Sequence, residues 1–441
     1  MPLTKVSAGV IAANAVVDSF GTQSITGDKL GLTAINANNI VSGAVTGDKL
    51  GATSINANNI VGGTITTTQI ASNTISNTNI QTGAIEVYSS SRSTGLFDGM
   101  RNRIINGAMV IDQRNAGASV TATTSIFGVD RALFQSSIAS KFSIQQNAGA
   151  VTPPVGFTNY QGVTSLAATA LGASDYYMMR QVIEGYNIAD LGWGTANAKT
   201  VTLSFWVRSS LTGTFGGAFQ NSAQDRSYPY TYTISVANTW EYKTVTVAGD
   251  TSGTWLSDNG VGIRLGFSLG TGSTLSGTAG AWSGSSFFSA TGATSVVGTN
   301  GATFYITGVQ LEVGSTATSF DYRPIGTELA LCQRYALKYN TDAIVYAFIG
   351  TGYATSTTNA NISLPLPVQM RTAPTVTAST LMVQDGTTIT AVTATAVVTN
   401  QTNSLNAFVQ ATVASGLTAF RPYQLQTNNS TSGNLLLSAE L

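Results

Sequence analysis

Residues 200–209 read TVTLSFWVRS, and this stretch decides the class of fold. Its side chains alternate between an apolar set and a polar set. The apolar set is Val201, Leu203, Phe205 and Val207, and the polar set is Thr202, Ser204, Trp206 and Arg208. Because successive side chains of a strand point to opposite faces of a sheet, the stretch predicts a strand with one face in a core. Trp206 falls on the other face.

Similar alternation occurs further along the chain. It is found in YTYTISV (230–236), EYKTVTVAG (241–249) and ATFYITGVQLEVG (302–314). In the last segment the pattern places Tyr305, Val309, Leu311 and Val313 on one face. Gly/Ser/Thr-rich segments such as GTGSTLSGTAGAWSGSS (270–286) separate the strands. Many strands joined by such turns predict a jelly-roll β-sandwich over residues 88–325.

The N-terminal part has a different pattern, a 20-residue repeat. ITGDKLG (25–31) returns as VTGDKLG (45–51), and INANNIVSG (35–43) returns as INANNIVGG (55–63). Within it an aliphatic residue recurs at every fifth position. This stripe comprises Ile25, Leu30, Ile35, Ile40, Val45, Leu50, Ile55, Ile60, Ile65, Ile70, Ile75, Ile80 and Ile85. A period of five fits neither a helix, near 3.6, nor a simple strand, at 2.

One chain offers too few large apolar side chains here to bury a core. Two structures solve this problem. A pentapeptide solenoid needs a small residue two positions before each aliphatic, and this chain mostly lacks one there: the residues are Gln23, Asp28, Thr33, Asn38, Gly43 and Asp48. Three chains wound together would share the stripe along one axis, and we favour this interpretation. We therefore expect an intertwined β repeat shaft over residues 21–87, preceded by an attachment segment over residues 1–20, and a homotrimer.

The C-terminal part, residues 326–441, begins with TELALCQRYALKYN (327–340). Its spacing predicts a short helix over 327–339, with Thr327 as N-cap and Cys332 buried on the apolar face. Six further segments, from IVYAFIG to NLLLSAEL, have the composition of strands. We expect a C-terminal β-sandwich tip, and the class of the whole chain is all-β.

Composition excludes several classes of function. The 441 residues contain 20 Lys and Arg, 20 Asp and Glu, one Cys and no His. Zero net charge without a basic block argues against nucleic-acid binding. The absence of His excludes Ser-His-Asp catalysis and His metal ligation. No apolar run is long enough for membrane insertion as a helix. We expect no cofactor and assign no metal site.

Several blocks resemble bacteriophage tail-fibre proteins. They are RNRIINGAMVIDQRNAG (101–117), GVDRALF (128–134), KTVTLSFWVRSS (199–210), GATFYITGVQLEVGSTATSFDYRP (301–324), ELALCQRYALKY (328–339) and LPVQMRTAPTV (366–376). The resemblance covers about residues 100–375 and depends on the order of the blocks. It implies a trimeric virion fibre with a carbohydrate-binding-module-like jelly roll and a receptor-binding tip.

Aromatic residues are the candidates for contact with a receptor, because flat rings stack on sugars. One group is Trp206 with Tyr228, Tyr230 and Tyr232 in DRSYPYTY (225–232), and the other is Phe420, Arg421 and Tyr423. Packing inside the protein is the competing interpretation for both groups. Sugar cleavage needs two carboxyl groups, and no close acidic pair occurs in the middle domain.

These observations predict a non-enzymatic phage tail fibre that binds a bacterial surface glycan. Its partners would be its own copies and, through the N-terminus, a tail or baseplate protein. A tailspike depolymerase is the alternative. A bacterial trimeric adhesin is a third interpretation, and it would require a secretion signal and an anchor that we do not expect.

Overall fold

The computed structural model describes residues 100–340 and 342–441. The repeat shaft, its axial stripe and the attachment segment lie outside these residues. The described part is nearly all β, with one α-helix among residues 100–340 and 342–441. The predicted all-β class and the jelly roll are confirmed.

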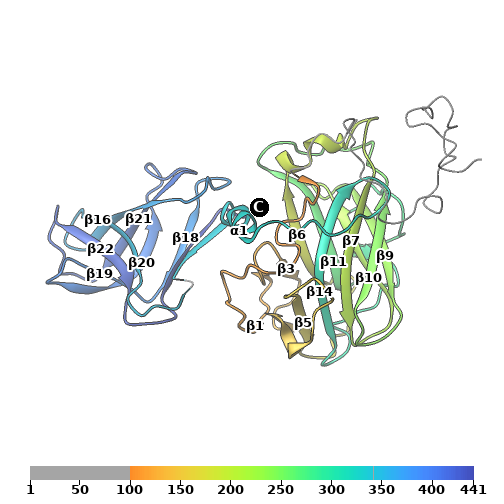
Figure 1. The fold of residues 1–441 in the computed structure, drawn as a ribbon, viewed down its shortest axis with the longest axis horizontal. Helices are drawn as coiled ribbons and strands as arrows, with labels where there is room; N and C mark the ends of the chain where they lie inside the picture. Colours follow the sequence, from red (N-terminus) through yellow and green to blue (C-terminus); the bar gives the residue numbers. More distant parts are fainter. Residues whose placement is uncertain (1–99, 341) are drawn as a thin grey trace, which may run out of the picture. The chain divides into compact units, whose positions relative to one another are not determined.

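Two antiparallel six-stranded sheets form a β-sandwich (Figure 1). Sheet 1 has the order β1 (Val120–Thr121), β4 (Phe142–Gln146), β5 (Gln161–Ser165), β14 (Thr303–Val313), β7 (Val201–Ser209) and β10 (Glu241–Val247). Sheet 2 has the order β2 (Ser125–Phe127), β3 (Leu133–Ser136), β6 (Tyr176–Glu184), β11 (Val261–Thr271), β8 (Gly213–Gln220) and β9 (Ser227–Ile234).

Short elements join these strands. They are the 3₁₀ turns η7 (Ala148–Ala150), η8 (Gly185–Asn187), η9 (Ala189–Leu191) and η10 (Ser273–Leu275), and the parallel pair β12 (Ser276–Gly277) and β13 (Ser289–Ala290).

The core lies between the two sheets, where β7 behaves as its alternation predicts. Phe205 of β7 packs edge-on against Tyr232 of β9 and Phe267 of β11, with ring centroids 4.9 and 5.1 Å apart. All four apolar residues of β7 are fully buried in this core. Trp206 is directed to the outer face of sheet 1, where it is half-buried.

The segment before the first strand, residues 101–113, is mostly buried although it has no strand pairing. Asn102 accepts hydrogen bonds from the backbone of Ile104 and Leu311, at 2.9 and 3.1 Å. Asn106 closes a turn to Ile111 through both its amide oxygen and its amide nitrogen. Buried backbone groups need hydrogen-bond partners, and these two side chains supply them. Both therefore have a structural role in the block at 101–117, which resembles tail-fibre proteins.

The C-terminal strands differ from the expected β-sandwich because six of them close into a barrel. The barrel order is β16 (Phe348–Ala354), β17 (Asn359–Pro365), β21 (Asn406–Val413), β20 (Ile389–Val397), β19 (Leu381–Gln384) and β22 (Pro422–Thr427). Strand β22 pairs with β16 and completes the ring. A separate sheet has the order β15 (Ala336–Tyr339), β23 (Asn434–Ser438) and β18 (Thr375–Ser379).

The helix α1 spans Ile325–Gln333 and is shorter than predicted. Pro324 is its N-cap, so Thr327 lies inside the first turn and does not cap it. Residues 336–339 form β15 instead, because they pair with β23. Cys332 is free and buried as expected, and it packs with Ile105 and Ile111.

Candidate functional site: an aromatic groove on sheet 1

A β-bulge in β14 shapes the outer face of sheet 1. Thr307 pairs with Trp206 and Gln310 pairs with Ser204, so β14 has one residue more than β7 at this point. Gly308 adopts φ 61° there. Glycine tolerates this left-handed conformation without steric cost.

The bulge corrects one sequence prediction. Tyr305 was assigned to the face of Val309 and Leu311, but the extra residue reverses the alternation between them. Phe304 and Ile306 therefore point into the core before the bulge, and Val309 and Leu311 do so after it. Tyr305 packs outside with Tyr160, at 5.1 Å between centroids.

An aromatic pair lies beside the bulge. Tyr242 of β10 stands directly opposite Trp206 of β7, and their ring centroids are 5.4 Å apart. Tyr242 is 43% exposed, and Trp206 is half-buried. The pair therefore presents aromatic surface to the solvent on a rigid sheet.

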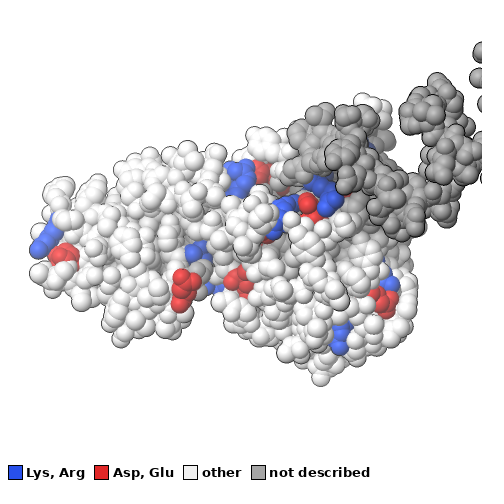
Figure 2. All heavy atoms as spheres, viewed as in Figure 1, with Lys and Arg blue, Asp and Glu red and all other residues white. Residues whose placement is uncertain are grey.

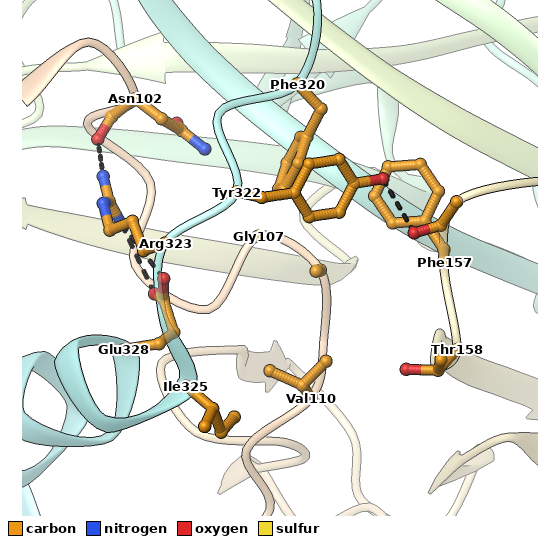
Figure 3. Close-up of a pocket in the computed structure, with 12 residues that line it drawn as sticks. Asn102, Gly107, Val110, Phe157, Thr158, Phe320, Tyr322, Arg323, Ile325 and Glu328 are labelled. Atoms are coloured by element: carbon orange, nitrogen blue, oxygen red, sulfur yellow. Dashed lines mark hydrogen bonds and ion pairs between the residues drawn. The ribbon is translucent and has the colours of Figure 1, made fainter.

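A second aromatic group forms a wall across the bulge from this pair. Phe157, Phe320 and Tyr322 contact one another, with centroid distances of 5.1, 5.6 and 4.8 Å. A Cβ on Gly308 would lie 2.6 Å from the Phe157 ring, so this ring rests against the bulge. The Tyr322 hydroxyl donates to the carbonyl of Gly156 at 2.8 Å and fixes the wall to the loop of Phe157 (Figure 3).

Buried polar side chains of β14 hold the loop that carries Phe320. Glu312 accepts hydrogen bonds from the backbone and the hydroxyl of Thr318, at 2.8 and 2.7 Å. Gln310 accepts one from the backbone of Asp321 at 2.8 Å. The loop is therefore ordered before any ligand binds, which lowers the entropy cost of binding.

The resulting groove has a volume of about 440 Å³. Its lining residues are aromatic or carry hydroxyls, apart from one glycine: Phe157, Ser204, Trp206, Tyr242, Gly308, Thr318, Ser319, Phe320 and Tyr322. None of them is charged. On the face drawn in Figure 2, most of the described surface is likewise uncharged, and the charged side chains lie mainly in pairs of opposite sign.

The aromatic wall also borders a second hollow of about 270 Å³ (Figure 3). Its charged residues are already engaged. Arg323 donates to the carbonyl oxygens of Asn102 and Ile104, and it lies 3.4 Å from both oxygens of Glu328. Glu328 also accepts a hydrogen bond from the backbone of Asn106. The pair thus anchors α1 to the segment at 101–113.

No protein-family model matches the chain, and no curated protein matches it in sequence. Some solved structures resemble it in part. The enzymatically active domain of tailspike protein 4 from bacteriophage CBA120 has a TM-score of 0.26 at 12% identity, over 48% of this chain and 22% of that one. A family 4 carbohydrate-binding module has a TM-score of 0.24 at 15% identity, over 47% and 98%.

A family 11 carbohydrate-binding module of Clostridium thermocellum, in complex with a β-1,3-1,4-mixed-linked tetrasaccharide, is similar at the same level. Its TM-score is 0.24 at 12% identity, over 45% of this chain and 99% of that one. All three TM-scores lie below 0.5. The fold assignment therefore rests on the observed strand order.

The structure separates the residues that the sequence grouped with Trp206. Tyr230 and Tyr232 lie in the sandwich core, where Tyr230 donates to the carbonyl of Gly266 at 2.9 Å. Burial raises the pKa of the Tyr230 hydroxyl well above its ordinary value. Tyr228 is only 9% exposed and packs on Trp282. These three tyrosines are corrected to core residues, because β9 faces sheet 1.

The C-terminal candidates are also divided. Tyr423 is 2% exposed inside the barrel, and its hydroxyl accepts a hydrogen bond from the backbone of Thr418, so it is corrected to a core residue. Phe420 is 83% exposed. Arg421 lies beside it in the chain and pairs with Asp385 at 3.0 Å. These two remain surface candidates, and no described residue gives Phe420 an aromatic partner.

The groove residues that the sequence did not reveal come from loops and from a second strand. Phe157 is far in the chain from Phe320 and Tyr322, and these residues meet Trp206 around the bulge at Gly308. Among the described residues, no cluster of His, Cys, Asp and Glu fits a metal ion. No helix in that part of the chain is long and apolar enough to cross a membrane.

Proposed function

We propose that this protein is a phage tail fibre that attaches the virion to its host by binding a neutral glycan in the aromatic groove of sheet 1. The observation that carries the proposal is the solvent-facing pair of Trp206 and Tyr242 beside hydroxyl-bearing residues, in a groove lined by no charged side chain. Rings of this kind stack on sugar faces, while hydroxyls exchange hydrogen bonds with the sugar.

Two supports for the wider role come from the sequence. The ordered blocks from residue 101 to residue 376 resemble phage tail-fibre proteins, and the five-residue stripe suits three intertwined chains. Three grooves on one particle would turn weak single-site binding into durable attachment.

Binding without cleavage is part of the proposal. Hydrolysis of a glycosidic bond uses a pair of carboxyl groups across the bond, and the groove lining contains none. The purified full-length protein should therefore release no reducing ends from host polysaccharide. Steady release that stops when an acidic pair is mutated would show a depolymerase instead.

The binding test is calorimetric titration of the full-length protein with neutral oligosaccharides from the host surface. Trp206→Ala should weaken binding by about tenfold or more, as loss of a stacked ring does. Tyr186→Ala is the matched control, because Tyr186 is 62% exposed but lies outside the groove. Equal affinity of wild type and Trp206→Ala would refute the groove as the site.

A further inference from the structure

The outer face of sheet 2 carries two neighbouring arginines that have no acidic partner in the part of the chain that the structure describes. Arg180 lies on β6 opposite Gly266 of β11, and Arg264 lies on β11 opposite Val182 and Gln220. Met179 and Leu265, their chain neighbours, point into the core. Alternation therefore directs both arginines to the outer face.

Arg180 is buried, at 4% exposure, and lies over the Phe288 ring at 5.4 Å from its centroid. Its charge has no counter-ion among the described residues. Its two terminal nitrogens donate to the side-chain oxygens of Gln135 and Gln220, at 2.9 and 2.8 Å. Its Nε is buried without a hydrogen-bond partner. Burial, with the charge of Arg264 as the next cause, lowers the pKa of Arg180 to about 10.

Arg264 is half-buried, and its side chain has no hydrogen bond or ion pair with residues 100–340 or 342–441. Its Nε is also buried and unpartnered. Arg208 and Arg371 are partly buried and donate to backbone carbonyls. Several other arginines with buried or partly buried side chains are paired with acids. These pairs are Arg103–Asp190, Arg114–Glu440, Arg131–Glu440, Arg226–Asp250 and Arg334–Glu184.

The backbone beside Arg264 is closed, since Gly266 and the residue opposite it on β8, Ala218, are both buried. The Arg264 side chain itself is only partly buried. A ligand would therefore reach the exposed part of this side chain and not the backbone. Two adjacent cations with reduced solvation are costly unless an anion neutralises them.

We propose that the outer face of sheet 2 binds an anionic group, a carboxylate or a phosphate, through Arg264, with the neighbouring charge of Arg180 strengthening the attraction. A guanidinium suits both groups because its parallel N–H donors match two oxygens of a carboxylate or a phosphate. This site is chemically distinct from the uncharged groove on sheet 1, and it does not depend on that groove.

The test measures binding of two probes to the full-length protein, inorganic phosphate and tetragalacturonate, by calorimetry at low and high salt. At least one probe should bind at millimolar concentration, and high salt should weaken its binding. Arg264→Gln should weaken it by about tenfold or more. Phosphate binding alone identifies a phosphate-bearing ligand, and tetragalacturonate binding alone identifies an acidic sugar.

Two controls separate this site from others. Arg208→Gln neutralises an arginine on the outer face of sheet 1, where it donates to the carbonyl of Asn238, and it should leave anion binding unchanged. Trp206→Ala should also leave it unchanged. The thermal midpoint provides a second measurement. Arg264→Gln should raise it in the absence of anion, and added anion should raise it only in proteins that keep Arg264.

Failure of both probes to bind would overturn the proposal, and so would binding that Arg264→Gln does not weaken. A lower midpoint for Arg264→Gln without anion would likewise show that Arg264 stabilises the fold by itself.

Discussion

Aromatic residues of this protein lie in opposite environments, some in the core and some on the surface, and the sequence alone does not distinguish the two. Trp206 and Tyr230 both lie in alternating strands. The first faces outward on sheet 1, and the second is 1% exposed in the core. Alternation shows which residues share a face, but the partner sheet decides which face is covered. Of the four receptor candidates in the sandwich, the structure places only Trp206 in the groove, and its role in binding stays a prediction.

Tyr230→Phe tests the core role at the level of one atom. The change removes the hydroxyl that donates to Gly266 and leaves that carbonyl without its buried partner. The free energy of unfolding should fall by about 1 kcal/mol, measured by denaturant titration. Glycan affinity should stay the same, whereas a loss of affinity equal to that of Trp206→Ala would place Tyr230 in the binding site.

At the scale of elements, the bulge in β14 shows what periodicity misses. One additional residue reverses the direction of every later side chain in the strand. The printed sequence contains a signal for it, since Gly308 interrupts an otherwise continuous run of strand-forming residues. The predicted helix over 327–339 extends past the end of α1 because periodicity also ignores strand pairing. Residues 336–339 keep a helical apolar spacing, but pairing with β23 over Ala336↔Ser438 to Tyr339↔Leu435 is the stronger constraint.

Gly308→Ala should disrupt the groove. The residue has φ 61°, and a Cβ would lie 2.6 Å from the Phe157 ring. We expect a loss of about 1–3 kcal/mol of stability from the strained backbone and weaker glycan binding, because Phe157 must move. Gly292→Ala is the control, since it has φ 77° but nothing within 4 Å of its Cβ. Equal glycan affinity in both variants would show that the position of Phe157 does not matter.

Arg334 connects the end of α1 to sheet 2. It forms two hydrogen bonds with Glu184, at 2.9 and 2.5 Å, and Tyr335 donates to the same carboxylate at 2.6 Å. Arg334→Ala would leave Glu184, at 1% exposure, without its counter-ion. Stability should fall by about 3 kcal/mol, measured by denaturant titration. Arg334→Lys should restore part of this loss, and no loss in Arg334→Ala would contradict the role of the pair.

At the scale of the whole molecule, the fold class could be predicted because alternation and turn composition recur along the chain. Closure of the barrel could not, because it depends on one long-range pairing of β16 with β22, for example Thr351↔Gln424. Nothing local to either strand marks it. The groove could not be predicted for the same reason. Two of its lining residues, Phe157 and Phe320, lie on loops that are more than 150 residues apart in the chain.

The proposed trimer yields a prediction on the full chain. Ile55→Asp would place three carboxylates on the shared axis, at a cost of several kcal/mol each. Native mass spectrometry should find three chains for the wild type and failed assembly for the variant. Ile55→Val is the conservative control and should assemble. A monodisperse wild-type monomer would contradict the shaft interpretation.

The last prediction concerns the stability of the part of the molecule where Gln113 donates to the carbonyl of Ala336 in β15. Asp130 is buried there and accepts hydrogen bonds from the backbone and the side chain of Gln113. Desolvation raises its pKa from 3.8 to about 6, although Arg114 opposes this shift at 3.7 Å and Glu440 adds to it.

Because the folded state binds this proton more tightly than the unfolded state, the stabilisation is complete below pH 4 and is lost as the pH rises through about 6. Asp130→Asn cannot titrate and is the matched variant. The difference in free energy of unfolding, wild type minus Asp130→Asn, should therefore fall by about 2–3 kcal/mol between pH 4 and pH 7. A difference that is constant, or that rises with pH, would mean that Arg114 outweighs burial and keeps Asp130 ionised.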